Sequence, residues 1–136
     1  MADDVILAKA AIIERCVVRV REVHGGDDGV LTRDITRQDS IVLNLQRACE
    51  ASIDLAMHIV RTRRLGVPQE SREAFGLLER AGLLDSDLAG RMSRMVGFRN
   101  IAVHDYRKLS MEIVASLVRE RLDDFLDFTR AALALA

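Results

Sequence analysis

Apolar residues recur at helical spacing along almost the whole 136-residue chain, and this period restricts the fold more than any other feature. The chain contains one proline, four phenylalanines, one tyrosine and no tryptophan, and 49% of its residues are hydrophobic. These features together predict a soluble all-α fold rather than a β-rich or disordered chain. The first stripe alternates in steps of four and three and consists of Ile6, Ala10, Ile13, Val17 and Val20.

The pattern predicts four long helices, one short helix and a single domain over residues 1–136. Short connections between such helices are typical of an up-and-down bundle, and a chain of this size can fold without a metal or a disulfide. The expected helices cover 3–24, 37–65, 71–81, a stretch from Asp85 or Ser86 into residues 99–106, and a stretch from Ser110 to the C-terminus.

Capping residues and helix breakers mark the ends of these helices. Thr36, Ser71 and Ser110 are expected to cap helices, because their side chains accept hydrogen bonds from free backbone N–H groups. Residues 30–35 are expected to form a loop. The sequence Gly66-Val67-Pro68 is expected to end the second long helix.

The formal net charge is −1, so the chain has no global basic field of the kind that binds duplex nucleic acid tightly. All cationic residues except Lys9 and Lys108 are arginines, which bind phosphate oxygens in a bidentate manner. Codon bias explains the same preference without any function, and it is the more ordinary explanation.

Cys16 and Cys49 lie on apolar stripes and lack a zinc or redox spacing, so both are expected to be buried, reduced thiols of a cytoplasmic protein. The N-terminus lacks a signal-peptide pattern, and no apolar run approaches the roughly 20 residues of a membrane span, so no membrane partner is expected. His24 and His58 belong to no metal-binding spacing, and neither a metal nor a cofactor is predicted.

Residues 99–106, RNIAVHDY, combine a permanent cation, an amide, an imidazole and a phenol within two helical turns. The chain has only three histidines and one tyrosine, and one of each stands here near an arginine. Arg99 and His104 are five residues apart, a rotation of about 140° on an ideal helix, so their side chains would diverge. They converge if the helix ends or loosens between them, which places the expected site at the C-terminal tip of this helix.

An arginine and a histidine at one site suit chemistry on a phosphate. RNA carries its own nucleophile, the 2′-hydroxyl. An imidazole that moves protons and a guanidinium that stabilises phosphorane charge can therefore cleave RNA without a metal. One histidine cannot easily act as acid and base at once, but two copies across a dimer could share these roles. Asn100 could contact the substrate or cap the helix end.

The spacing of Arg99 and His104 resembles the R-x(4–6)-H signature of HEPN domains, many of which are metal-independent ribonucleases. The stretches MVGFRNIAVHDY at 95–106, DSIVLNLQRACE at 39–50 and LGVPQ at 65–69 are similar to those of the HepT toxins, and the resemblance covers nearly the whole chain. It implies a HEPN-like bundle that forms homodimers, with Arg99 and His104 as the catalytic pair in a cleft at the interface.

The same resemblance implies a partner and a form of regulation. HepT toxins are paired with MNT, a minimal nucleotidyltransferase that serves as antitoxin, and in similar systems MNT adenylylates the tyrosine that corresponds to Tyr106. Tyr106 lies within about 7 Å of His104 along an extended chain, so an AMP group there would occupy the place of an RNA phosphate. The expected function is thus an endoribonuclease toxin whose products carry 2′,3′-cyclic phosphate and 5′-hydroxyl ends.

Less specific interpretations exist for the same residues. His104 could satisfy carbonyls at a helix end, and Tyr106 could pack against the last helix. The chain as a whole could be a non-catalytic module that binds a nucleotide or partners a nucleotidyltransferase, or it could be a plain dimerising scaffold. The sequence does not identify the RNA, although the scarcity of aromatic residues argues against strong base stacking.

A polar stripe at heptad spacing follows the second long helix and consists of Asn44, Arg47, Asp54 and His58. Such a stripe is usually a solvated face. The alternative is that it borders the RNA cleft or the antitoxin surface, with Arg47 as an auxiliary phosphate contact. The cations at the end of this helix favour its dipole, and phosphate contact is the weaker interpretation for them: Arg61, Arg63 and Arg64.

Overall fold

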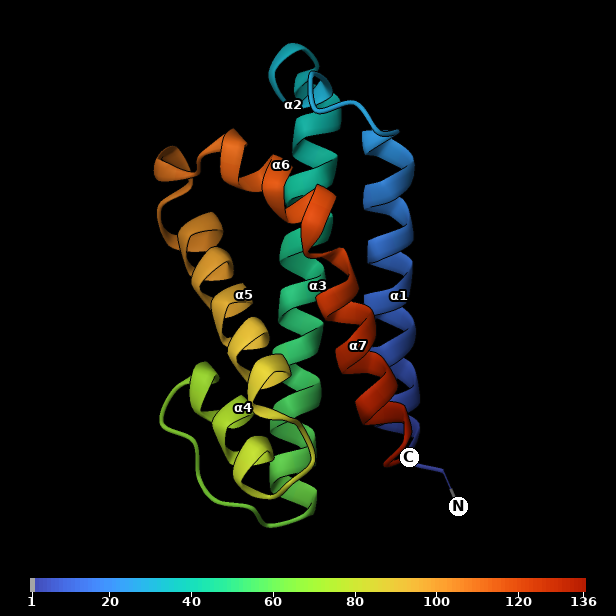
Figure 1. Ribbon diagram of the computed structural model, residues 1–136, viewed down its shortest axis with the longest axis vertical. Helices are drawn as coiled ribbons and strands as arrows, with labels where there is room; N and C mark the ends of the chain where they lie inside the picture. The colour runs from blue at the N-terminus through green and yellow to red at the C-terminus, as the bar shows by residue number, and fades with distance from the viewer. Residues whose placement is uncertain (1) are drawn as a thin grey trace.

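The computed structural model describes residues 2–136 and confirms the predicted all-α fold, with no β-strand in this range (Figure 1). None of the helices within the described residues combines the length and the hydropathy needed to cross a bilayer. The helices are α1 (Asp4–His24), α2 (Val30–Arg33), α3 (Ile35–Thr62), α4 (Ser71–Arg80), α5 (Ser86–His104), the 3₁₀ helix η1 (Tyr106–Lys108), α6 (Met111–Glu120) and α7 (Leu122–Leu133).

Helix α3 is the central element of the bundle. Figure 1 shows α1 and α7 along one side of α3 and α5 along the other, with α4 near the C-terminal end of α3. The side chains of Ile41, Leu55 and Ile59 on α3 are almost completely buried, so this helix supplies much of the core. Phe75 of α4 packs edge to face on Phe128 of α7, with ring centroids 5.4 Å apart.

Side-chain caps fix the starts of four helices. The carboxylates of Asp3, Asp34 and Asp85 accept hydrogen bonds from free N–H groups at the starts of α1, α3 and α5, and the Ser110 hydroxyl does so for α6. The prediction for Ser110 is therefore confirmed. The cap of α3 is Asp34 rather than Thr36.

Residues 30–33 form the short helix α2 rather than the predicted loop. Val30 and Leu31 are buried, and the Gln38 amide of α3 donates a hydrogen bond to the Leu31 carbonyl over 2.8 Å. These tertiary contacts stabilise a turn that is too short to show a helical period in the sequence. Ser71 also differs from its prediction, because it is the first residue of α4 rather than its cap, and no side chain caps this helix.

Helix α3 ends at Thr62, three residues before the predicted end. Arg64 takes a left-handed conformation with φ of 54°, and the Leu65 N–H donates a hydrogen bond to the Val60 carbonyl over 2.9 Å. Helices commonly end in this way with a glycine at the left-handed position. An arginine stands there in this chain, and its Cβ makes the conformation less favourable.

The expected last helix is divided into α6 and α7 at Arg121, whose φ of −122° and ψ of 0° are not helical. Figure 1 shows α6 leaning across one end of the bundle and α7 running alongside α1. Arg91 of α5 anchors the start of α7, because its Nη1 donates to the carboxylates of Asp124 over 2.7 Å and Asp127 over 3.0 Å. A contact from another helix therefore holds the start of α7 directly after the division.

Both cysteines are free and buried, as the sequence predicted. Burial raises the pKa of the Cys16 and Cys49 thiols. The sulfur of Cys49 lies 3.5 Å from the Met95 carbonyl oxygen of α5. Protonated thiols in such surroundings act as small core side chains rather than as nucleophiles.

Candidate active site

A polar hollow of about 350 Å³ lies between the start of α4 and the C-terminal half of α5. Arg99, Asn100 and His104 all line it, so the structure brings three of the five candidate site residues together. The remaining lining residues come from the segment before α4, from α4 itself and from α5: Glu70, Ser71, Arg72 and Val96.

Helix α5 is unbroken from Arg99 to His104, so the expected loosening between these residues is wrong. The helix ends directly after His104, where Asp105 has φ of −151° and its N–H donates to the Ile101 carbonyl over 2.9 Å. The two side chains share the hollow because it extends over two helical turns and α4 forms its opposite wall.

Two other helices hold the Arg99 guanidinium in place. Its Nη1 donates to the Glu50 carboxylate of α3 over 3.4 Å, and its Nη2 donates to the Ser71 hydroxyl of α4 over 3.1 Å. The side chain is only 17% exposed, and its Nε–H is buried without a hydrogen-bond partner among the described residues. A buried donor without an acceptor is unfavourable. Arg99 is therefore a fixed and incompletely satisfied cation on the wall of the hollow.

His104 is exposed, and no hydrogen bond or ion pair to the described residues holds its ring. A histidine that satisfied the carbonyls at the end of α5 would show such a bond, so the structural interpretation of His104 gains no support. Asn100 is also exposed, four residues before the end of α5, and does not cap it. Nowhere in residues 2–136 do three or more His, Cys, Asp or Glu side chains gather closely enough to hold a metal ion.

Tyr106 opens η1 two residues after His104, and 46% of it is exposed. Burial of the remainder and the nearby Asp39 carboxylate of α3 raise the pKa of the phenol. The phenol is therefore protonated at neutral pH. Tyr106 does not line the hollow, but it lies at the same end of α5 as His104 and is accessible from solvent.

Arg47 does not belong to the hollow. It is exposed on α3 and its charge acts on the Cys16 thiol, which places it toward α1. Within one copy of the chain, the structure therefore does not bring Arg47 together with Arg99 and His104.

The rest of the polar stripe on α3 is only partly solvated. Asp54 is exposed and pairs with Lys9 of α1 over 3.1 Å, and Asn44 donates a hydrogen bond to a carbonyl of its own helix. His58 is only 8% exposed, and its Nε2 lies 2.7 Å from the Asp3 carboxylate. The expectation of a solvated face is therefore wrong for His58, which joins the end of α3 to the start of α1.

Sequence reasoning missed three residues that hold Arg99 or line the hollow. Glu50 and Ser71 bind the Arg99 guanidinium, and Arg72 forms part of the wall. Ser71 resembles a helix cap, whereas Glu50 and Arg72 resemble ordinary charges on a helix surface. Glu50 and Arg99 are 49 positions apart, so no local spacing could have indicated their contact.

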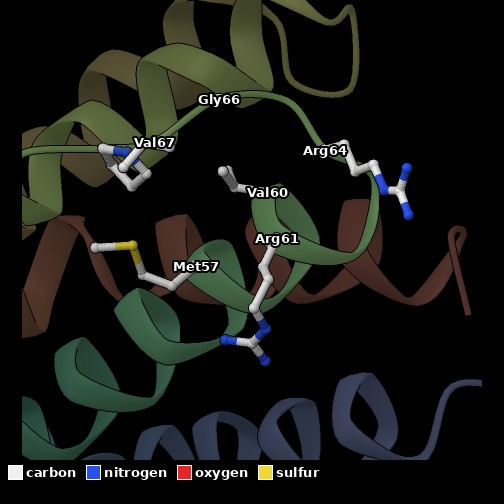
Figure 2. A pocket seen from close by; sticks show the side chains of 7 residues that line it. Met57, Val60, Arg61, Arg64, Gly66 and Val67 are labelled. Carbon is white, nitrogen blue, oxygen red and sulfur yellow. The ribbon is translucent and has the colours of Figure 1, made fainter.

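A second hollow, of about 580 Å³, lies where α3 ends and the chain turns back toward α4 (Figure 2). Val60 and Val67 belong to its mostly apolar wall. Figure 2 shows the guanidinium groups of Arg61 and Arg64 extending away from Val67. One of them is already engaged, because Arg61 Nη2 lies 3.3 Å from His58 Nδ1. Phosphate contact at this end of α3 therefore gains no support.

The fold and the hollow define a class of protein, namely a helical bundle in which an arginine and a histidine of one helix share a polar hollow. The family model described as Ribonuclease HepT-like matches residues 13–132. The chain is 48% identical over 126 residues to the mRNA nuclease HepT of Shewanella oneidensis, across 93% of this chain and 94% of that protein. The chain belongs to the HepT-like ribonuclease family.

Solved structures agree with this assignment. The tri-AMPylated Shewanella oneidensis HEPN toxin in complex with MNT antitoxin is 46% identical, with a TM-score of 0.91 over 97% of this chain and 98% of that chain. A toxin–antitoxin structure with AMP-PNP is 45% identical, with a TM-score of 0.92 over 97% of this chain and 99% of that chain. The predicted HEPN-like fold is therefore confirmed.

Proposed function

We propose that this chain is an endoribonuclease toxin that cleaves RNA without a metal, with Arg99 and His104 as its catalytic pair. One observation carries the proposal: a fixed guanidinium and an imidazole that bonds to none of the described residues share one polar hollow, in a chain 48% identical to an mRNA nuclease. Asn100 lines the same hollow and is proposed as a substrate contact.

The proposed reaction uses the nucleophile that RNA itself carries. The His104 imidazole takes the proton of a 2′-hydroxyl, the 2′-oxygen bonds to phosphorus, and the bond from phosphorus to the 5′-oxygen breaks. An imidazolium returns a proton to that oxygen, which leaves a 2′,3′-cyclic phosphate and a 5′-hydroxyl. Such proton transfer contributes about 10²–10⁴-fold to the rate, and Arg99 stabilises the charge of the phosphorane.

A homodimer completes this chemistry, because a second His104 can act as the acid while the first acts as the base. Ile101 and Val103 are exposed apolar side chains on the last turn of α5, beside the hollow. A partner copy that covered them would bring two hollows together and remove apolar surface from water. The exposed Arg47 is retained as a candidate phosphate contact from the second copy.

The test is RNA cleavage by the purified protein in excess EDTA. We expect cleavage with cyclic-phosphate ends, its loss in His104→Ala, and full activity in the control Arg80→Gln, an exposed arginine of α4 outside the hollow. Complete dependence on Mg²⁺, or full activity of His104→Ala, would contradict the mechanism. A folded wild-type protein that cleaves no RNA would favour a non-catalytic module that binds a nucleotide or partners a nucleotidyltransferase.

We also propose that a nucleotidyltransferase antitoxin of the MNT type silences the chain by adenylylating Tyr106. The phenol oxygen would attack the α-phosphorus of ATP, and pyrophosphate would leave. The AMP-modified relative in complex with its MNT antitoxin supports this regulation, and Tyr106 is exposed at the end of α5 that carries His104. The added phosphodiester would compete with an RNA phosphate for the same cations.

Mass spectrometry of the chain co-expressed with its nucleotidyltransferase tests this regulation. We expect a mass increase that corresponds to AMP, and its absence in Tyr106→Phe. An unmodified wild-type chain, or AMP on another residue, would overturn the assignment.

A further inference from the structure

Arg72 lines the hollow from the opposite side to His104 and has no role in the mechanism above. It is the second residue of α4 and is exposed, yet its guanidinium lies against α5. Its Nη2 would stand 2.6 Å from a Cβ built on Gly97, so Gly97 makes room for this guanidinium. The absence of a side chain at Gly97 therefore leaves the space that the Arg72 guanidinium occupies.

Arg72 forms no ion pair with a carboxylate of the described residues, although Glu70 lines the same hollow. Arg99, in contrast, is bound by Glu50 and Ser71. A cation in the first turn of a helix also opposes the helix dipole, so the stability of α4 does not explain Arg72. Both observations point to an anion that comes from outside the chain.

The position of Arg72 indicates which anion. Gly97 and His104 are seven residues apart on α5, a rise of about 10 Å, so the two groups stand at opposite ends of the hollow. A phosphate in contact with His104 is the scissile one. We propose that Arg72 binds the phosphate next to the scissile phosphate of the RNA, and that Gly97 provides the space that its guanidinium needs to reach this phosphate. This inference rests on the proposed ribonuclease function.

The first test is the kinetics of Arg72→Gln, with Arg80→Gln of the same helix as the matched control. Contact with a flanking phosphate binds ground state and transition state alike, so KM rises about tenfold and kcat changes less than about twofold. The control keeps both constants. A large fall in kcat with KM unchanged, or no change in either constant, would overturn the proposal.

Binding provides a readout that a merely structural role of Arg72 would not change. In the His104→Ala background, loss of one phosphate contact reduces the slope of log Kd against log salt by about 0.7 for single-stranded RNA. The melting temperature should not fall, because Arg72 is exposed and its charge opposes the dipole of α4. An unaltered salt slope would contradict a direct contact with phosphate.

Gly97→Ala displaces the guanidinium without removing a charge. Its methyl group meets only the flexible end of Arg72, and alanine favours the helix, so the fold should become more stable. We expect KM to rise as in Arg72→Gln, and Gly97→Ala to have no further effect in the Arg72→Gln background. Additive effects would show that the methyl group blocks RNA directly, which contradicts the role given to Gly97.

The outcome for the wild-type protein separates the two proposals. If the wild type cleaves no RNA, the proposed function fails. If it cleaves RNA and Arg72→Gln matches it in KM and salt slope, only the inference about Arg72 fails.

Discussion

The hollow beside α5 and the hollow at the end of α3 each include two arginines in their walls, yet they differ in how these cations are held. Beside α5, Arg99 is fixed by bonds to two other helices, and the His104 imidazole in the same hollow bonds to no residue that the structure describes. At the end of α3, Arg61 and Arg64 extend away from an apolar wall (Figure 2).

The difference shows that the number of cations does not identify a site. Arg61 and Arg64 lie where the negative end of the α3 dipole favours any positive charge, so helix stability explains them. Arg99 is partly buried with an unsatisfied donor, and folding alone does not explain that arrangement. The comparison predicts that substitutions in the first hollow change catalysis, whereas substitutions in the second change only stability.

The largest expected effect is that of Arg99→Lys. Lysine keeps the charge but loses the fork that binds Glu50 and Ser71 together, so kcat should fall about 100-fold. Steady-state cleavage of a labelled RNA measures this loss. The double substitution Arg61→Gln, Arg64→Gln is the control and should keep kcat and KM. A comparable loss in the control would remove the distinction between the hollows.

A smaller effect, on stability, is expected for Arg64→Gly. Glycine adopts the φ of 54° at this position without the steric penalty of a Cβ, so the free energy of unfolding should rise by about 1 kcal/mol. Urea unfolding measures the change, and RNA cleavage should be unaffected. The neighbouring Arg63→Gly, at φ of −97°, should instead destabilise the chain. Equal effects of the two substitutions would contradict the role of the left-handed conformation.

The smallest expected effect concerns the pair formed by Asp3 and His58, whose imidazole also contacts Arg61. The hydrogen bond to His58 lowers the pKa of the Asp3 carboxyl below 3.8. Because the folded pKa is depressed, the contribution of Asp3 to stability is present above pH 3.8 and is lost as the pH falls through the lower, folded pKa. Asp3→Asn should therefore lower the melting temperature at pH 7, and the difference from wild type should shrink below pH 3.8.

Thermal unfolding between pH 7 and pH 3 measures this difference. Asp4→Asn is the control, since Asp4 lies beside Asp3 in the first turn of α1 and is not paired with His58. A constant difference between Asp3→Asn and wild type over the whole range would contradict the pairing.

The helices and the candidate pair could be predicted because both are local in sequence. The period of three and four residues marks α1, α3 and α5, and Arg99 and His104 belong to one short stretch. The wall around Arg99 could not be predicted, because Glu50 and Ser71 reach it from helices that only the fold brings together.

The break between α6 and α7 at Arg121 could not be predicted from the sequence for a related reason. Val114 and Val118 of α6 continue the apolar spacing of Leu122 and Phe125 in α7, so the period runs through the break. At the break, Arg91 of α5 binds the carboxylates of Asp124 and Asp127 in α7, a contact between helices that no local spacing indicates. The prediction that His58 is solvated failed for the same reason, because His58 contacts the Asp3 carboxylate, which lies 55 positions away in the sequence.

The end of α5 has one more consequence. His104 closes the helix and Tyr106 opens the following turn, with Asp105 alone between them. A nucleotidyltransferase that adenylylates Tyr106 would need access only to this end of α5, in a chain that has already folded. Under the proposed adenylylation, the chain is therefore silenced after it has folded, by a change confined to this end of α5.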